Sequence, residues 1–242
     1  MSQIEGRNPV LEALRTNTEI NKILVQRNAG GSMHLIFEGA KRQGVVIVET
    51  EKATLDKLSE GRPHQGVIAQ ISVEEYAELD DIIATARASA VPLLVVLDHI
   101  EDPHNLGAII RSALAAGAHG VVIPKRRSAA LSPSVAKASA GAASHLPVAR
   151  VPNLTQCVKE LKEEGFWVIG AEAGGKSLYE SKFTGPLALV VGSEGEGIGR
   201  LLKENCDEII TIPMQGPVNS LNASVAAGVV LFEIVRQRGL TK

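Results

Sequence analysis

The chain has 242 residues, of which 45% are hydrophobic and 21% are charged, and its net charge is −2. This composition is typical of a globular protein with a sizeable core, and it excludes the overall basic signature of many nucleic-acid binders, although a local basic patch is enough to bind nucleic acid. Aromatic residues make up only 3%, which argues against a surface that stacks many bases of a single strand.

Residues 1–73 are predicted to form a small α/β domain. Its short elements alternate, with helices expected at 9–15 and 33–42 and strands at 22–25, 45–48 and 66–71. The next stretch, 74–91, is acidic and then rich in alanine, and it is interpreted as a linker or an acidic helix.

From residue 92 onward, apolar strands alternate with amphipathic helices, which predicts a mostly parallel sheet with helices on both faces. The run at 92–97 is continuously apolar, as expected for a strand buried on both sides. The further strands are expected at 120–123, 147–151, 166–171, 187–192 and 208–212, and the helices at 106–116, 133–142, 154–164 and 220–237.

Three polar turns that bear glycine follow strands of this second domain, within 97–117, 189–199 and 210–228. In an open α/β sheet, ligands bind outside the carboxyl ends of the strands. The three turns therefore predict one composite site.

In the first turn, Asn105 and Arg111 are the residues of interest. Pro103 and Asn105 mark the change from strand to helix, and Gly107 permits a close approach of the backbone. Two alternatives stay open, because Asn105 can be a helix N-cap and Arg111 a solvated helix residue. Their place at the ligand edge of the sheet favours a role in a site.

The second turn, 190–198, is rich in glycine, which lets backbone amides approach a ligand. It has neither the G-x-G-x-x-G spacing of a dinucleotide-binding loop nor the Lys-Ser/Thr of a P-loop. Glu194 and Glu196 favour a cationic or hydroxyl-bearing ligand over an anionic one. A flexible acidic turn is the alternative.

In the third turn, apolar Ile212, Met214 and Leu221 can line a pocket for an adenine-like ring. We expect Asn219 or Ser220 to cap the last helix, since Asn222 would already fall within its first turn. A plain capped core helix is the alternative for this segment.

A basic loop formed by Lys125, Arg126 and Arg127 follows another strand and suits contacts with RNA phosphates, although solvated surface charge is the alternative. His99 and His104 border the first turn without a third partner, so we expect no metal site. The sequence contains no hydrolase motif of the G-x-S-x-G or H-E-x-x-H type.

The cysteines and the N-terminus indicate the compartment. Cys157 and Cys206 lie far apart without metal-ligand spacing, which predicts a reducing, cytoplasmic setting and no disulfide framework. The segment MSQIEGRNPV does not have the pattern of a signal peptide, and no stretch reaches the roughly 20 apolar residues that span a bilayer.

Together, the three turns resemble the three motifs of the SpoU-type RNA ribose 2′-O-methyltransferases of the SPOUT superfamily. The motifs correspond to DPHNLGAIIRSA (102–113), VVGSEGEGI (190–198) and IPMQGPVNSLNASVA (212–226). The segments EGRNPVLEAL (5–14) and HQGVIAQI (64–71) resemble the small ribosomal-protein-like domain with which many members hold RNA. The resemblance covers nearly the whole chain.

The resemblance implies a fold, a cofactor and an assembly. Residues 92–242 would form a parallel-sheet SPOUT domain with a trefoil knot, an exception to the rule that chains avoid knots. S-adenosylmethionine would be the methyl donor, without a metal. Two chains would form a homodimer with the active site near their interface, and RNA would be the substrate, with no role for a membrane.

The resemblance also assigns roles to individual residues. Backbone and apolar surface from Gly192, Ile212 and Leu221 would contact the methyl donor, and Met214 and Gly195 would shape the pocket. The reacting ribose and methyl group would be surrounded by Asn105, Arg111, Glu194, Ser220 and Asn222.

The proton acceptor stays open at this point. Arg111 suits a phosphate clamp or an oxyanion stabiliser better than a general base, because a guanidinium stays protonated near neutrality. Glu194 or a substrate phosphate is a competing acceptor, and Asn105 would orient Arg111 or the ribose.

The implied reaction is methyl transfer to the ribose 2′-hydroxyl of a guanosine in large-subunit (23S) ribosomal RNA. The alternatives are a transfer-RNA enzyme of the same family and a non-catalytic RNA-binding factor of ribosome assembly. An unrelated α/β nucleotide binder is disfavoured by the missing phosphate-binding motifs.

Overall fold

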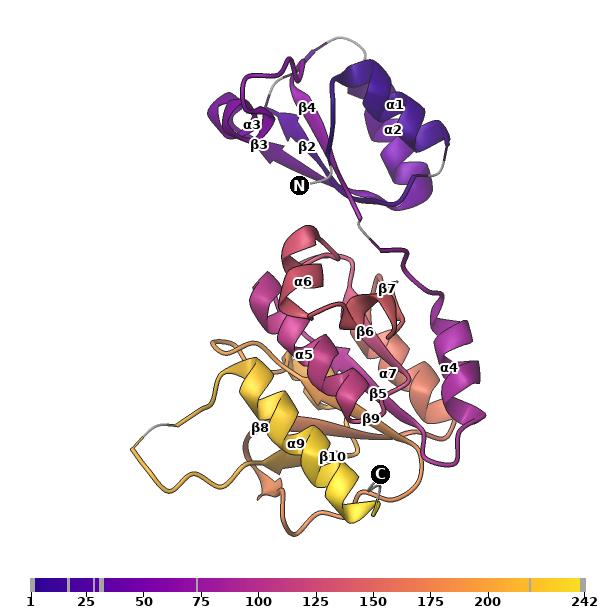
Figure 1. Ribbon diagram of the computed structural model, residues 1–242, viewed down its shortest axis with the longest axis vertical. Helices are drawn as coiled ribbons and strands as arrows, with labels where there is room; N and C mark the ends of the chain where they lie inside the picture. Colours follow the sequence, from indigo (N-terminus) through magenta and orange to yellow (C-terminus); the bar gives the residue numbers. More distant parts are fainter. Residues whose placement is uncertain are drawn as a thin grey trace. The chain divides into compact units, whose positions relative to one another are not determined.

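A computed structural model describes residues 3–16, 18–27, 29–30, 33–72, 74–217 and 219–239. The chain divides into two compact units, Met1–Glu75 with Ala130–Pro133 and Tyr76–Ala129 with Ser134–Lys242 (Figure 1). The predicted boundary at residue 73 lies outside the described residues, and the three-part division stays a prediction. The acidic stretch after it contains a helix, α4 (Leu79–Arg87).

The first unit is built on a four-stranded sheet in the order β1-β4-β2-β3. Its strands are β1 (Gln3–Glu5), β2 (Ile20–Gln26), β3 (Val46–Thr50) and β4 (Val67–Ile71). Its helices are α1 (Arg7–Arg15), α2 (Met33–Gln43) and α3 (Lys52–Ser59). The predicted mixed α/β character is confirmed, whereas β1 and α3 were missing from the prediction.

Side chains that alternate along the strands divide the first unit into two layers of packing. Ile23 and Val25 of β2 belong to the cluster that contains the buried residues of α1 and α2. Leu24, between them, packs with Leu55 of α3 on the opposite face. The sheet is therefore covered on both sides.

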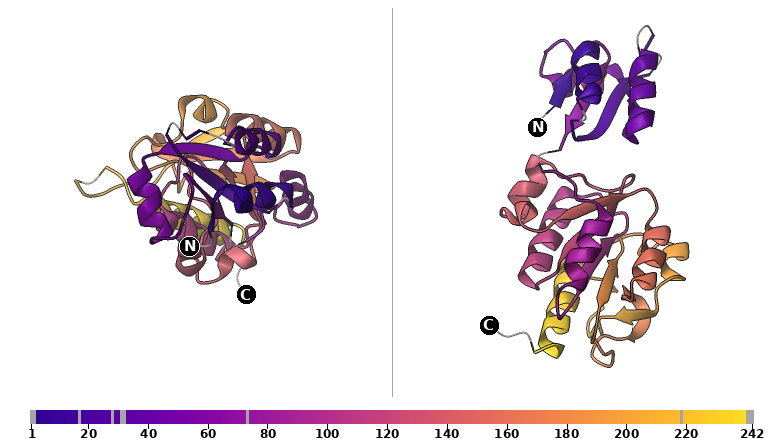
Figure 2. Two further views of the ribbon diagram at one scale, coloured as in Figure 1. Left: turned by 90° about the horizontal axis from the view of Figure 1, so that it is seen from above. Right: turned by 90° about the vertical axis from the view of Figure 1, so that its right-hand side faces the viewer.

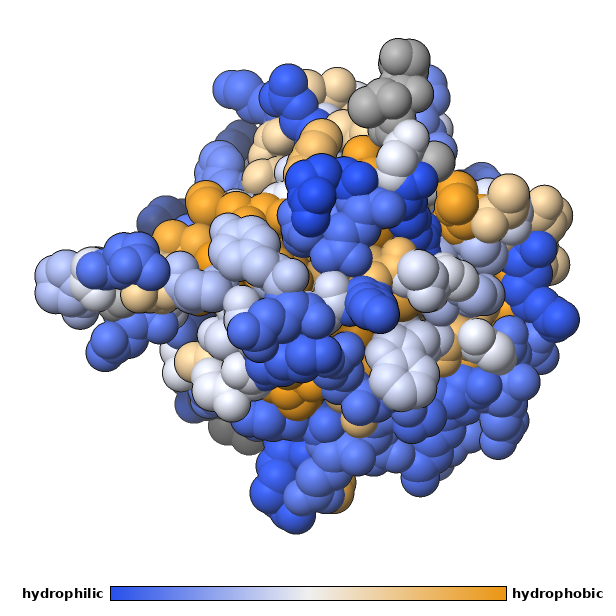
Figure 3. Space-filling model, turned by 90° about the horizontal axis from the view of Figure 1, so that it is seen from below, coloured by the Kyte–Doolittle hydropathy of each residue, from blue (hydrophilic) through white to orange (hydrophobic). Residues whose placement is uncertain are grey.

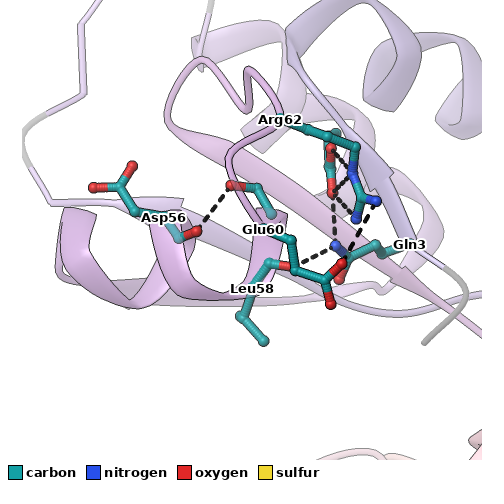
Figure 4. Close-up of polar contacts among 7 residues, drawn as sticks. Gln3, Asp56, Leu58, Glu60 and Arg62 are labelled. Atoms are coloured by element: carbon teal, nitrogen blue, oxygen red, sulfur yellow. Dashed lines mark hydrogen bonds and ion pairs between the residues drawn. The ribbon is translucent and has the colours of Figure 1, made fainter.

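Polar contacts fasten the short strand β1 to the last turn of α3 and to the segment that follows it (Figure 4). Gln3 Nε2 donates to the Leu58 carbonyl oxygen at 2.8 Å. The Arg62 guanidinium donates to the Glu5 carboxylate at 2.9 and 3.0 Å, and these hydrogen bonds lower the pKa of Glu5 below its usual value of 4.5. A strand this short is held by such contacts rather than by a periodic apolar pattern.

The second unit contains an all-parallel sheet in the order β10-β8-β9-β5-β6-β7. The strands are β5 (Leu93–Leu97), β6 (Gly120–Pro124), β7 (Val148–Val151), β8 (Trp167–Ser177), β9 (Leu187–Val191) and β10 (Glu208–Thr211). The helices after α4 are α5 (Pro103–Ala115), α6 (Pro133–Ala138), α7 (Leu154–Glu163), α8 (Arg200–Lys203) and α9 (Ala223–Gln237), with a 3₁₀ turn at Ala142–Ser144.

Helices cover both faces of this sheet, as its apolar central strands require (Figure 1; Figure 2). The central strands β5 and β9 are buried along their whole length. On one face, α4 and α7 pack against alternate strand residues such as Leu94 and Val96. On the other face, α5 and α9 lie side by side. The predicted parallel sheet is confirmed, and the trefoil knot stays a prediction.

Helix α5 begins earlier than predicted because of its cap. Asp102 accepts a hydrogen bond from the His104 amide at 2.9 Å and Pro103 occupies the first helical position. Asn105 therefore lies inside the helix, and its alternative interpretation as the N-cap is wrong.

Helix α9 begins later than predicted, and its cap is a different residue. Asn222 Oδ1 accepts hydrogen bonds from the Ser224 and Val225 amides at 3.0 and 3.3 Å. The expectation that Asn219 or Ser220 caps this helix is therefore wrong. The sequence predicts Asn222 inside the first turn because the predicted helix, 220–237, begins before the observed start at Ala223.

Strand β8 extends beyond the predicted end at residue 171 to Ser177. Its pairing with β10 shifts register between Ile209 and Ile210. A Cβ at Gly175 would lie 2.3 Å from the Ile209 carbonyl oxygen, so the irregular pairing needs glycine at this position. A glycine-rich segment is normally interpreted as a loop, which explains the short prediction.

Candidate functional site

A cavity of about 320 Å³ lies where β8, β9 and β10 end. Parallel neighbours point the same way, so the turns after these strands meet at one edge of the sheet. The residues that give the cavity its apolar surface include Val191, Ile210, Ile212, Met214, Leu221, Ala223 and Ala226.

All five residues predicted to contact or shape the methyl-donor pocket line this cavity. They are Gly192, Gly195, Ile212, Met214 and Leu221. The structure thus brings two of the three predicted turns together around one cavity. Which ligand they contact remains a prediction.

The turn after β9 is held very close to itself. A Cβ at Gly192 would lie 2.2 Å from the Gly197 carbonyl carbon, so no side chain fits there. Gly197 itself has a φ of +67°, in the left-handed region that favours glycine. Gly195 has open space around the position of a Cβ, so packing does not require glycine at that site.

Three residues from three separate turns meet beside the cavity. Asn105 Nδ2 donates to Glu194 Oε1 at 3.0 Å, and Asn222 Nδ2 donates to Asn105 Oδ1 at 2.9 Å. Asn222 Nδ2 also donates to Glu194 Oε1, and the Ala223 amide donates to the same oxygen at 3.3 Å. The predicted composite of three turns is therefore present as a hydrogen-bonded cluster.

Of the two other residues predicted around the ribose, one lines the cavity and one does not. Ser220 forms part of the cavity wall. Arg111 lies on α5, six residues beyond Asn105, and is exposed. No residue in the described part of the chain forms an ion pair with Arg111. Arg111 is thus not joined to the cluster within one chain.

The predicted basic loop follows β6 and does not line the cavity. Arg126 and Arg127 are exposed, whereas Lys125 is half-buried and its carbonyl oxygen accepts a hydrogen bond from Arg150 Nη2 at 3.2 Å. These cations are available at the surface rather than at the reacting cluster.

Two carboxylates near the cavity were missed by the sequence analysis. Glu172 lines the cavity, and Asp98 lies directly after β5 and is 5% exposed. The available signal was their position, because Asp98 directly follows β5 and Glu172 directly follows the predicted apolar strand at 166–171, although it lies within β8 in the structure. Such residues at this edge are candidates for a site even without a motif.

The charges around the cavity favour a cationic ligand. Glu172, Glu194 and Glu196 all line it. Lys203, which forms an ion pair with Glu172 at 2.6 Å, is not part of the wall. A ligand that combines an aromatic ring with a positive centre fits both the apolar wall and these carboxylates.

No group of three or more His, Cys, Asp or Glu that could hold a metal occurs among the residues that the structure describes. His99 instead pairs with Asp98, with Nδ1 and Oδ1 3.0 Å apart. None of the helices within the described ranges is long and apolar enough to cross a bilayer.

Comparison with known proteins gives matches over nearly the whole chain. Residues 92–232 match the SpoU rRNA Methylase family, and residues 3–77 match the family described as RNA 2′-O ribose methyltransferase substrate binding. A Bacillus subtilis protein whose name includes the words TrmH family tRNA/rRNA methyltransferase is 48% identical over 236 residues. That match covers 96% of this chain and 94% of the relative.

Two solved structures resemble the fold of this chain. An AdoMet-bound rRNA methyltransferase from Sinorhizobium meliloti has a TM-score of 0.63 and 25% identity, with 99% of this chain and 88% of that one covered. The SpoU methyltransferase AviRb from Streptomyces viridochromogenes, in complex with AdoMet, has a TM-score of 0.61 and 26% identity, with 99% and 91% covered.

Proposed function

The chain belongs to the SpoU rRNA Methylase family and is an RNA methyltransferase, and we propose that it methylates the ribose 2′-hydroxyl of an RNA nucleotide with S-adenosylmethionine as donor. The observation that carries the proposal is the cavity of about 320 Å³ with the Asn105–Glu194–Asn222 cluster at its side. A donor pocket and a polar cluster for the acceptor are the two parts that such a transfer requires.

The cavity suits S-adenosylmethionine in shape and charge. Gly192, Ile212 and Leu221 would hold it, with Met214 and Gly195 shaping the pocket, and the carboxylates on the wall would favour its positive sulfonium. When bound, the donor supplies an electrophilic methyl group. The two structural relatives named above are described with AdoMet, which supports the same assignment.

The cluster would position the acceptor and stabilise charge that develops on its oxygen. Asn105 and Asn222 offer amide groups to the ribose, and Ser220 lies on the adjoining wall. Glu194 is a candidate proton acceptor, in competition with a substrate phosphate. Arg111 stays protonated near neutrality, so its proposed role is to clamp a phosphate or to stabilise the oxyanion.

We further propose a homodimer in which the partner chain completes the site. Arg111 is separated from the cluster of its own chain, and α9 exposes Val225 and Phe232, each 51% accessible. Exposed apolar side chains that gather on one face mark protein–protein interaction sites, and most soluble homo-oligomers are twofold dimers. A second copy packed here would bring another α5, with its Arg111, towards the cluster.

RNA would be held by both units of the chain. Within the first unit, a cavity of about 830 Å³ is lined by Arg7, Lys52 and Arg62. Arg62 forms an ion pair with Glu5, which leaves Arg7 and Lys52 as cations for phosphates on this wall. In the second unit, Lys125, Arg126 and Arg127 would add contacts to the backbone of the RNA.

The proposed target is a guanosine of large-subunit ribosomal RNA, in a reducing cytoplasm. A transfer RNA is the second candidate, because the name of the Bacillus subtilis relative includes both RNA classes. A non-catalytic RNA-binding factor is disfavoured, since the cavity and the polar cluster are both formed.

Mapping of methylated nucleosides by mass spectrometry tests this proposal. RNA from cells that lack the protein should lose one 2′-O-methylated nucleoside, and the purified protein should restore it with S-adenosylmethionine. Loss of the methylated nucleoside from ribosomal RNA supports the ribosomal target, and its loss from transfer RNA supports the transfer-RNA target. Unchanged nucleosides in both RNA classes, together with no heat on titration with millimolar S-adenosylmethionine, would overturn the enzyme assignment.

A further inference from the structure

The turn at 192–199 has little to hold it in shape from within. Four of its eight positions are glycine, which leaves the backbone with high conformational freedom. Two hydrogen bonds lie within the turn. The Gly197 amide donates to the Ser193 carbonyl oxygen at 3.0 Å, and the Glu196 amide donates to Ser193 Oγ at 3.3 Å. A cavity wall built from such a turn needs anchors from outside.

Two carboxylates from different strands supply those anchors. The Ile198 amide donates to Glu172 Oε2 at 3.0 Å, and the next amide, of Gly199, donates to Asp98 Oδ2 at 2.8 Å. Glu172 lies on β8 and Asp98 directly follows β5. Hydrogen bonds to a carboxylate are stronger than those between neutral groups, so two consecutive amides are firmly fixed.

Each carboxylate is itself oriented by a second contact. Glu172 Oε1 lies 2.6 Å from Lys203 Nζ, and Asp98 Oδ1 lies 3.0 Å from His99 Nδ1. The side chain of Asp98 is 7% exposed, so it has little room to turn away. Both anchors are therefore preorganised before any ligand arrives.

The glycines of the turn fit these anchors sterically. A Cβ at Gly197 would lie 3.2 Å from Glu172 Oε2, and a Cβ at Gly199 would lie 3.2 Å from Asp98 Oδ2. A side chain at either position would crowd the oxygen that accepts the amide hydrogen. The close approach of carboxylate and backbone thus explains why glycine stands at these two places.

We propose that Glu172 and Asp98 are positioning residues that hold the turn at 192–199 in the conformation that forms the donor pocket and directs Glu194 to Asn105 and Asn222. This inference rests on the proposed function, because it concerns the same pocket. It adds two carboxylates that none of the three motifs singles out for the donor site.

Titration calorimetry and steady-state kinetics test the proposal. Glu172→Ala should weaken the binding of S-adenosylmethionine about tenfold or more, the effect of one charge-assisted hydrogen bond. Glu172→Gln keeps an acceptor oxygen and should recover part of the affinity. The KM for the donor should rise while the KM for RNA stays unchanged. Asp98→Ala should act in the same direction, and Asp98→Asn, which also keeps an acceptor oxygen, should have a smaller effect.

The matched control is Glu204→Ala, which removes an exposed ion pair with Arg200 on the neighbouring helix α8. It should leave donor affinity unchanged. If Glu172→Ala and Asp98→Ala bind the donor as the unmodified protein does, the inference is wrong.

Hydrogen exchange separates this inference from the proposed function. In the ligand-free protein, Glu172→Ala should speed exchange of the Ile198 amide, and Asp98→Ala that of the Gly199 amide, each by about tenfold or more. This measurement needs no donor, so it stands even if the protein binds no S-adenosylmethionine. Unchanged exchange at both amides would overturn the anchoring itself.

Discussion

Asn222 shows how a single residue can join a helix end to a reactive cluster. Its Oδ1 caps α9 by accepting from the Ser224 and Val225 amides, while its Nδ2 donates to Asn105 and Glu194. The oxygen of this amide therefore stabilises the start of the helix, while its nitrogen contacts the cluster. A substitution that keeps only one of these contacts can distinguish the two functions.

We expect Asn222→Ser to retain the cap but to lose the amide donor, so that methyl transfer falls while thermal stability stays near that of the unmodified protein. Asn222→Ala should lose both, with a stability loss of about 1 kcal/mol. Asn153→Ala, which removes the cap of α7, is the control that should lower stability alone. Full activity in Asn222→Ser would remove this amide from the site.

Arg111 forms no ion pair with the described residues of its own chain. General acid–base assistance is typically worth about 10²- to 10⁴-fold, and we expect Arg111→Ala to lose more than this in kcat because a developing negative charge would be left uncompensated. Donor affinity should survive, since Arg111 does not line the cavity. Arg87→Ala, at an exposed ion pair with Glu164, should leave kcat unchanged. Near-normal turnover of Arg111→Ala would contradict the assignment.

At the scale of elements, the sequence pattern predicted the interior of most long helices and strands, whereas the helix predicted over 133–142 ends at Ala138. The apolar runs at β5 and β9 are buried on both faces, and burial on both sides is what such runs require. Element ends were less predictable, because they depend on single hydrogen bonds. The side chain that caps each helix decides where it begins. Asp102 caps α5, and Asn222 caps α9.

The site was predictable where it is local and hidden where it depends on tertiary contacts. Gly192 and Glu194 lie in one recognisable turn, and the structure places both on the cavity wall. Glu172 contacts the same turn from a distance of 26 positions in the sequence, and no local pattern records that contact. Arg111 lies outside the cluster, and nothing in the sequence of one chain indicates this separation.

Helix α9 carries a carboxylate that makes its stability depend on pH. Hydrogen bonds from Arg236 and Gln237 lower the pKa of Glu233 from 4.5 to about 2. A lowered pKa means that the folded state favours the ionised form, so its stabilising contribution is fully present above 4.5 and is lost as the pH falls towards 2. The loss should therefore be confined to acidic conditions.

Urea unfolding of the protein and of Glu233→Gln measures this effect. The stability difference between the two should be largest at about pH 6 and should shrink between about pH 4.5 and pH 2, as Glu233 takes up its proton. Arg236 is largely exposed, so added salt should also reduce the difference. A difference that stays constant over this pH range would show that Glu233 does not carry the dependence.

At the scale of the whole molecule, the chain consists of two compact units. Each unit has its own sheet and its own buried cluster of apolar side chains. The surface of the second unit is not uniformly polar, and Figure 3 shows apolar patches between hydrophilic residues on the face that it draws. Among the exposed apolar side chains, Val225 and Phe232 share a face of α9 because they are seven residues apart.

Replacing Phe232 by Glu should place a charge on this face and shift the protein towards the monomer, since burying an unpaired carboxylate in an interface is costly. Sedimentation at a series of concentrations measures the shift. Leu201→Glu, at another exposed apolar side chain, is the control that should leave association unchanged. A protein that is monomeric without any substitution would remove the proposed assembly.

A mixing experiment then tests whether the site is shared between two chains. Arg111→Ala and Glu194→Ala should each be inactive alone. If Arg111 of one chain serves the cluster of the other, a mixed dimer contains one site with both residues intact. Random exchange makes half of the dimers mixed, and each mixed dimer has one working site of two. Mixing the two variants should therefore restore up to about a quarter of the normal activity. The same mixture carrying Phe232→Glu in both chains should recover nothing. No recovery from the first mixture, despite confirmed exchange of subunits, would place Arg111 and Glu194 in the same site of a single chain.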